Sequence, residues 1–218
     1  MEDELKKNIQ ELQRVRQLER QRTNELARVH LDILKILLAI IEIRDEYTYL
    51  HSQRVTSYVL KIAAAMNFPN AEGMHLRIAS LLHDIGKIGI PDVELYKRIS
   101  LTANELAMIR SHPAIGARIL GNVELLAPVV PAVLSHHEHY DGRGHPHGLA
   151  GDKIPLGARI IAVADAYDAL TSVRPYREAL SPEEALNEII HGAGTQFDPL
   201  VVEAFKQVWE EIKDIPPY

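Results

Sequence analysis

The stretch from Leu81 to Pro91, LLHDIGKIGIP, is the segment around which the rest of this chain is organised. An apolar run leads into His83 and Asp84, and glycines and a proline follow. A helix that ends in His-Asp can direct an imidazole and a carboxylate at one cation, and the second carboxylate oxygen can serve another cation. Lys87 lies one helical turn further on, within reach of an anion held there. Alone, His-Asp is usually only a solvated helix end, so its meaning depends on the other motifs.

Further residues of metal-ligand type recur at intervals that suit one set per helix or helix pair. They are His51, His112, the pair His136-His137, and Asp165. Adjacent residues on a helix diverge by about 100°, so His136 and His137 fit one ion poorly but can serve two neighbouring ions. The whole set favours a site for more than one metal. For a lone histidine such as His51, the plainer interpretation is a surface or capping residue.

These motifs together resemble the HD-GYP domains, a subgroup of the HD-domain phosphohydrolases associated with hydrolysis of cyclic di-GMP. The resemblance spans about residues 30–210, and the motifs occur in order. The matching strings are HSQRV (51–55), LLHDIGKIGIP (81–91), HPAIG (112–116), HHEHYDGRGHP (136–146), ADAYDALTSVRPYR (164–177) and GAGTQFDP (192–199). Their number and order exclude chance as an explanation, although each motif is a hypothesis about structural context.

The resemblance implies two divalent metal ions that hold a bridging hydroxide and neutralise phosphoryl oxygens. One ion would be bound by His51, His83 and Asp165, the other by His112, His136 and His137, with Asp84 bridging both. Ligands that are all nitrogen or oxygen suit iron or manganese, and zinc and nickel are alternatives.

Four more residues are expected to act on the substrate or the ligands. Lys87 would contact the phosphate, and Arg174 and Arg177 would grip phosphate or guanine. Asp168 would orient the attacking water or a ligand histidine. The two arginines have a plainer interpretation as structural ion pairs.

The chain departs from the family pattern at two places. Gly144-His145-Pro146 stands where the family has Gly-Tyr-Pro, which puts substrate handling or docking to a partner in doubt. Tyr47 stands where some members have a glutamate that binds a third ion, so we expect two ions. The remaining histidines match no ligand position and are expected to be ordinary polar residues: His30, His75, His139, His147 and His191.

Composition limits the class of protein. The 218 residues include no cysteine, which excludes disulfides and thiolate metal sites. The formal net charge of −6 argues against a general nucleic-acid binder. No apolar run approaches the about 20 residues of a membrane helix, and no signal peptide is visible. We therefore expect a cytoplasmic protein that does not insert into a membrane.

The fold class predicted from the sequence is all-α, because no two-residue alternation of apolar and polar residues is found. Capping patterns place helix starts at Thr102, Ser181 and Asp198. One bent helix is expected over residues 123–137, and a loop over residues 140–155.

The N-terminal segment predicts a separate element. Apolar stripes over residues 5–40 indicate a long coiled-coil-like helix. We expect residues 1–30 to form a stalk that holds a homodimer and residues 31–218 to form the catalytic domain. The alternative is a solvated helix that leans on its own domain. Such stalks often connect to an upstream sensor domain, and docking to a cyclase is a further possibility.

Three functions from different classes remain open at the level of sequence. The leading one is a phosphodiesterase that opens cyclic di-GMP to linear pGpG, and in some cases on to GMP. The second is a receptor that binds a cyclic dinucleotide without turnover and signals through the N-terminal helix. The third is an HD hydrolase for another cyclic dinucleotide or nucleotide.

Overall fold

The computed structural model describes residues 46–91, 102–173 and 178–215, together with residues 11–22 and a few isolated positions before residue 40. The chain divides into two compact units, Met1–Ile40 and Ile41–Tyr218. In the first unit, residues 11–22 are helical and exposed. The domain boundary expected at residue 30 stays a prediction, and most of the apolar positions expected between residues 23 and 40 lie outside the described residues.

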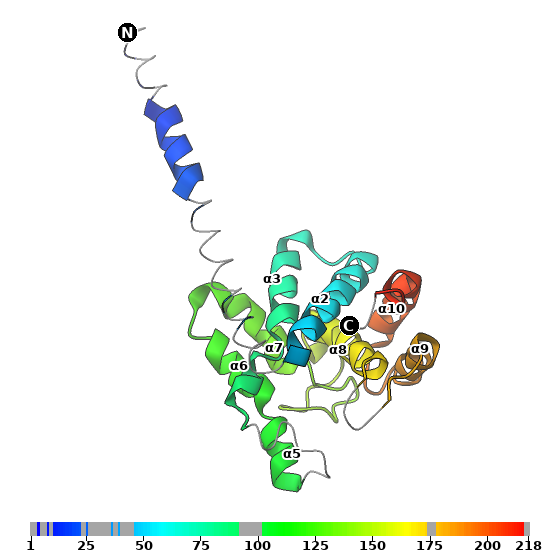
Figure 1. Cartoon of the computed structure of the whole chain (residues 1–218). Coiled ribbons are helices and arrows are strands. Elements are labelled where there is room, and N and C mark those ends of the chain that lie inside the picture. The colour runs from blue at the N-terminus through cyan, green and yellow to red at the C-terminus, as the bar shows by residue number, and fades with distance from the viewer. Residues whose placement is uncertain are drawn as a thin grey trace. The chain divides into compact units, whose positions relative to one another are not determined.

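The second unit is built from helices (Figure 1). Its described residues contain no strand, only two isolated bridges, so the all-α prediction is confirmed. The α-helices are α2 (Glu46–Ala65), α3 (Asn70–Leu82), α5 (Ala103–Ile109), α6 (His112–Leu120), α7 (Val130–Ser135), α8 (Leu156–Thr171), α9 (Pro182–His191) and α10 (Pro199–Ile212). Short 3-10 helices are η1 (Ile85–Gly89), η2 (Glu124–Val129) and η3 (Gly151–Lys153).

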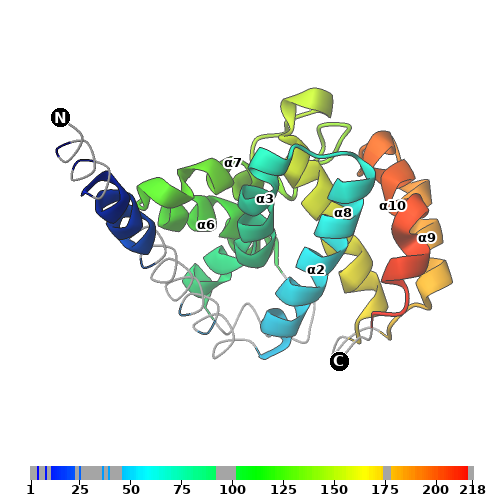
Figure 2. The same ribbon diagram turned by 90° about the horizontal axis from the view of Figure 1, so that it is seen from above.

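The hydrophobic core lies where α2 packs against α3, α8 and α10, an arrangement that Figure 2 shows from above. Fully buried side chains come from one face of each helix, for example Val59 and Ile62 of α2, Ile160 of α8 and Phe205 of α10. Burial of each such side chain contributes about 1.5–3 kcal/mol. This packing fixes the helix ends from which the polar residues of the site project.

The expected caps are present in the structure. Thr102 and Ser181 each form a capping box with the glutamate three residues later. The side chain of Asp198 accepts a hydrogen bond from the backbone N–H of Leu200 at the start of α10. Each cap satisfies backbone donors that the first helical turn leaves unpaired.

The prediction of one bent helix over residues 123–137 is wrong. The segment forms η2, which contains Pro128, and then α7, which ends at Ser135. Proline lacks the backbone N–H and clashes with the preceding turn, so two consecutive proline-containing turns break the segment into short pieces. His136 and His137 therefore lie in the turn after α7, not on a helix.

The backbone of η1 lies directly against the start of α6, and Gly86 makes this approach possible. A Cβ at Gly86 would overlap the carbonyl oxygen of His112 and lie 2.6 Å from the backbone nitrogen of Gly116. Backbone atoms cannot yield as the end of a flexible side chain can. The glycine in the HDIGK string thus keeps His83-Asp84 and His112 close together.

We predict that Gly86→Ala lowers the free energy of unfolding by about 3 kcal/mol or more, because η1 and α6 must separate. Gly73→Ala is the matched control: Gly73 lies in α3 with nothing within 4 Å of its Cβ position. That change should stabilise the protein by about 0.5–1 kcal/mol. Urea unfolding of both variants measures the contrast, and equal effects would contradict it.

Candidate two-metal site

Helix ends, together with one position inside each of α2 and α8, bring the polar residues of the site together. His51 lies in the first half of α2, His83 and Asp84 follow α3, and His112 begins α6. His136 and His137 follow α7, and Asp165 lies in α8. His51, His83, Asp84, His112 and His136 are buried, and His137 and Asp165 are partly exposed. Residues from five separate segments therefore converge on one buried point.

The ligand atoms form two groups, each with its atoms within 4.8 Å of one another. His51, His83 and Asp165 make group A, and His112, His136 and His137 make group B. In group A, His51 Nε2 lies 3.3 Å from both His83 Nε2 and Asp165 Oδ1. In group B, His112 Nε2 lies 3.3 Å from His136 Nε2.

Asp84 lies between the two groups and faces each with a different oxygen. Its Oδ1 is 3.2 Å from His112 Nε2 of group B. Its Oδ2 is 3.5 Å from His83 Nε2 and 3.7 Å from His51 Nε2 of group A. A carboxylate in this position can contribute one oxygen to each of two cations.

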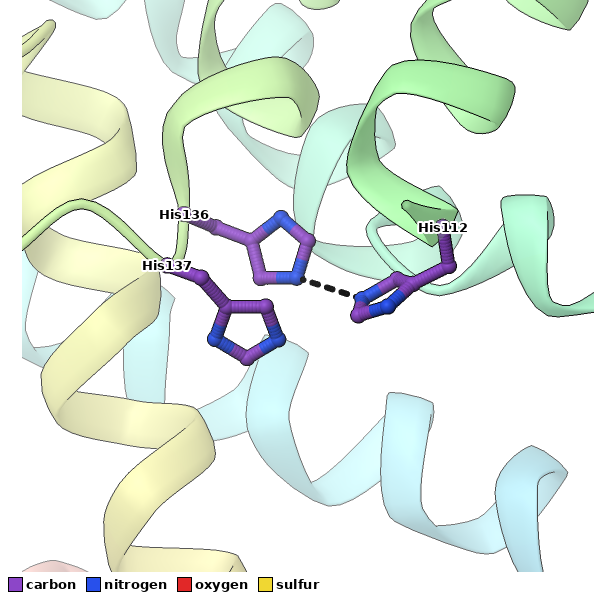
Figure 3. Close-up of side chains that lie close together, drawn as sticks. All are labelled: His112, His136 and His137. Carbon is purple, nitrogen blue, oxygen red and sulfur yellow. Dashed lines mark hydrogen bonds between the residues drawn. The ribbon is translucent and has the colours of Figure 1, made fainter. Parts of the chain in front are cut away.

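The three imidazoles of group B converge on one point (Figure 3). The rings of His136 and His137 are 4.1 Å apart between centroids and tilted by 43°. The inference that adjacent histidines serve one ion poorly is therefore wrong for this pair. It assumed helical geometry, whereas the turn after Ser135 lets both rings face His112.

Three of the histidines expected to be ligands are oriented by the same local bond. Each donates its Nδ1–H to the carbonyl three residues earlier, and each of these carbonyls belongs to the last turn of a helix that would otherwise leave it unpaired. The pairs are His83 with Ser80 (2.8 Å), His112 with Ile109 (2.8 Å) and His136 with Val133 (2.7 Å). A carbonyl only accepts, so the proton lies on Nδ1 and the lone pair of Nε2 faces the site.

His51 is oriented by a side chain instead. Its Nδ1 lies 2.7 Å from Asp168 Oδ2. Arg54 holds the same carboxylate through two bonds, Nε to Oδ1 at 2.6 Å and Nη2 to Oδ2 at 2.8 Å. The hydroxyl of Ser172 adds a bond of 3.3 Å to Oδ2. Asp168 therefore lies behind His51 and contacts the ligand, not the centre of the site.

The surroundings of Asp165 in group A and of the shared Asp84 lower the pKa of both carboxyl groups and so favour their charged forms. Burial alone would raise the pKa of Asp165, but hydrogen bonding with His51 and the nearby histidines hold it well below its ordinary value. Asp84 behaves likewise, since Lys87, His83 and His112 outweigh its burial and lower its pKa. Burial alone would lower the pKa of His51, but Asp165 and Asp168 raise it to about 9.

In group B, the surroundings of His136 and His137 lower the pKa of each imidazole. Burial lowers the pKa of His136, and the neighbouring histidines lower it further. Burial also lowers the pKa of His137 to about 3. Neutral imidazoles are the form that binds metals. Burial therefore favours neutral imidazoles at His136 and His137 of group B, while group A combines two imidazoles with a carboxylate.

The donor atoms fit divalent metal ions. In group B, His112 and His136 each donate Nδ1–H to a carbonyl, so when both rings are neutral their Nε2 atoms present lone pairs to each other at 3.3 Å, which is unfavourable unless a cation lies between them. A metal–nitrogen distance of about 2.1 Å places adjacent ligand atoms about 3.0–3.4 Å apart. Imidazole with carboxylate suits iron, manganese, zinc or nickel rather than calcium or magnesium.

Lys87 is the other expected site residue that the structure describes, and it lies at the edge of the site. Its Nζ is 2.6 Å from Asp84 Oδ2, and 29% of its side chain is exposed. Arg174 and Arg177 lie outside the described residues, as does the side chain of Tyr47. Their expected roles stay predictions.

Sequence reasoning missed two buried charged residues. Arg54, three residues after His51 in HSQRV, could have been found from its helical spacing, because positions i and i+3 share a face. Glu138 accepts the backbone N–H of His147 at 2.7 Å and of Leu149 at 3.1 Å. It fixes the loop after His137, and no spacing in the sequence indicated this.

An all-helical domain that gathers two adjacent groups of histidine and aspartate around a shared carboxylate defines a class of helical metal-site proteins. A family model described as HD domain matches residues 35–201, and the chain belongs to this family. The HD domain is a metal-dependent hydrolase fold. No described helix is long and apolar enough to cross a membrane.

Two similar proteins show how much of a longer chain this sequence matches. A cyclic di-GMP phosphodiesterase of Thermotoga maritima is 41% identical over 84% of this chain and 50% of its own length. A 3'3'-cGAMP-specific phosphodiesterase of Vibrio cholerae is 36% identical over 78% of this chain and 33% of its own length. The chain thus spans about half or less of the length of these relatives.

A solved structure of an HDGYP protein from Bdellovibrio bacteriovorus has a TM-score of 0.62 at 19% identity. The similarity covers 75% of this chain and 52% of that protein. At this identity the likeness shows a shared fold, in agreement with the helical architecture described above.

We predict that Asp168→Asn weakens binding of the ion at group A by about 10–100-fold, because His51 loses the charged partner that orients it. The metal-to-protein ratio should fall from two towards one as free metal is lowered. Ser172→Ala keeps the Arg54–Asp168 pair and is the control. Mass spectrometry of the native protein measures the ratio, and equal loss from both groups would count against this role.

Proposed function

We propose that this protein is a metal-dependent phosphodiesterase that hydrolyses cyclic di-GMP to linear pGpG. One observation carries the proposal: two buried three-ligand groups lie side by side and Asp84 directs one carboxylate oxygen at each. The family membership and the relative named cyclic di-GMP phosphodiesterase support it.

Phosphodiesters resist hydrolysis because their anionic oxygens repel a nucleophile and the leaving alkoxide is poor. Two adjacent divalent ions, when bound, supply charge that neutralises the phosphoryl oxygens and lowers the pKa of water. The chain's part is to hold the ligands in place. Asp84 would set the spacing of the two groups, and Asp168 would keep His51 in the orientation that presents Nε2.

Substrate contacts would come from positive side chains at the edge of the site. Lys87 is the described candidate, because its ammonium is partly exposed and lies beside the shared carboxylate. Arg174 and Arg177 are proposed to bind phosphate or guanine through their planar guanidinium groups. The contact of Lys87 with Asp84 also supports a role in balancing the charge of the carboxylate.

The proposed metals are two ions per chain, with iron or manganese as the first choice. The six residues of groups A and B together with Asp84 account for both ions. A third ion would need a ligand outside this set. The protein is proposed to act in the cytoplasm.

A second candidate is a hydrolase for a mixed cyclic dinucleotide, which the 36% identical cGAMP-specific relative favours. A receptor without turnover is less well supported, because a site that only binds nucleotide has no need for both ligand groups. These alternatives share the metal site and differ in substrate.

The deciding experiment loads purified protein anaerobically with iron or manganese and supplies cyclic di-GMP, cGAMP, cyclic di-AMP and linear pGpG. We expect cyclic di-GMP to be opened to pGpG, with slower action on pGpG itself. Preference for cGAMP would favour the second candidate. Nucleotide binding without hydrolysis by fully loaded protein would make the protein a receptor.

We predict that Asp84→Ala loses both ions as well as activity, since its carboxylate lies between the two groups. Lys87→Ala should keep two ions and reduce turnover or substrate affinity. Metal analysis together with the phosphodiesterase assay separates these outcomes. Two ions at full occupancy in Asp84→Ala would show that the carboxylate does not bridge. Loss of metal in Lys87→Ala would contradict the proposed role of the lysine in substrate contact.

The N-terminal unit is proposed to hold the protein as a homodimer and to transmit the state of an upstream sensor domain or a cyclase partner. The exposed apolar side chains of Leu12, Val15 and Leu18 support a helix that packs on a second copy. We predict that removing residues 1–28 converts a dimer to a monomer. Light scattering measures this, and an unchanged mass would exclude the stalk as the dimer contact.

A further inference from the structure

His145 takes the central position of the segment Gly144-His145-Pro146, and the proposed function gives it no role. This segment packs directly on the ligand His137. A Cβ at Gly144 would lie 2.5 Å from the carbonyl oxygen of His137 and would overlap the backbone nitrogen of His139. The backbone N–H of His145 donates to that same His137 carbonyl at 3.1 Å. The position of His145 is therefore tied to His137 by the backbone.

The ring of His145 presents a free acceptor. Its Nδ1 is buried and has no hydrogen-bond partner among the described residues. The ring lies near the backbone of Arg110, two residues before His112. In the tautomer with its proton on Nε2, His145 presents a lone pair on Nδ1. A buried acceptor without a partner is unfavourable.

His137 lacks what the other ligand histidines have. In four of these histidines, the ring nitrogen that faces away from the site is hydrogen-bonded to a carboxylate or a carbonyl. They are His51, His83, His112 and His136. In the described part of the chain, no such bond is found for His137. Metal-binding histidines almost always donate their second N–H to an acceptor, which fixes the ring and raises its basicity.

The unpaired acceptor and the unpaired donor are neighbours. The rings of His137 and His145 are 5.1 Å apart between centroids, with a tilt of 37°. Two imidazoles joined edge to edge by an N–H···N bond of about 3 Å would have their centres about 5 Å apart, counting the two ring radii. Histidine χ2 is a broad torsion, so a rotation about it can align the lone pair with the N–H.

We propose that His145 is a positioning residue that accepts the outer N–H of His137 and so completes group B. His145 then does for His137 what the helix carbonyls do for His112 and His136. This inference rests on the proposed two-ion site. It assigns the histidine of Gly-His-Pro to orienting a ligand, not to contact with substrate.

The test compares two substitutions at position 145. In His145→Leu the acceptor is lost, while in His145→Asn the side-chain oxygen can take the place of Nδ1. We expect His145→Leu to weaken binding of the group B ion by about 10–100-fold, with the group A ion retained, and His145→Asn to stay within a few-fold of the wild type. His147→Leu is the matched control, since His147 is exposed and only its backbone contacts Glu138.

Two readouts separate failure of this inference from failure of the proposed function. Metal titration followed by native mass spectrometry gives the stoichiometry without any substrate. NMR of zinc-loaded protein with nitrogen-labelled histidine detects the outer N–H of His137, which should exchange slowly in the wild type and rapidly in His145→Leu. A wild type that does not bind two ions overturns the two-ion site and this inference together.

If the wild type binds two ions, the variants decide the role of His145 alone. Unchanged ion affinity in His145→Leu overturns the proposal, and so does a rise in KM without loss of metal, which would place the side chain at the substrate. Equal loss of metal in His145→Leu and His145→Asn overturns it as well, because loop packing would then be the cause.

Discussion

Imidazole nitrogens and carboxylates are costly to bury unless each polar atom has a partner, and this protein buries several of both at one point. The outer and the inner polar atoms of these side chains are satisfied in different ways. The outer atom of most ligands is satisfied by the protein, through a helix carbonyl or through Asp168. In group B the inner nitrogens of His112 and His136 are left facing one another, an arrangement that a cation would satisfy. The hydrophobic core of α2, α8 and α10 keeps this set of atoms from relaxing apart.

Two short helices place their ends next to the site. The last carbonyls of any helix lack a partner within the helix, and α5 and α7 stop where these carbonyls can meet a histidine. The carbonyl at the end of α5 accepts from His112, and one in the last turn of α7 accepts from His136. In both cases the histidine follows the carbonyl by three residues. Pro128 and Pro131 set where α7 begins, because proline is tolerated in the first turn of a helix but not in its interior.

Much of the site could be predicted from the sequence because its ligands carry distinctive chemistry in ordered motifs. Helix caps such as Thr102 with Glu105 were predictable because both partners lie within one helical turn. The relation between His136 and His137 was not, because it depends on where α7 ends. The spacing of Arg54 places it on the same helical face as His51, but its partner Asp168 lies far along the chain. Glu138 was missed because its partners lie in a loop, where no spacing indicates them.

The bonds from His83, His112 and His136 to helix carbonyls also link ligand geometry to local unfolding. The carbonyls of Ser80 and Val133 belong to the final turns of α3 and α7, the parts of a helix that fray most easily. When such a turn opens, the imidazole loses its orienting bond in the same event. Ion binding and protection of these turns from hydrogen exchange are therefore reciprocal: a bound ion raises the free energy of opening, and an opened turn releases the ion.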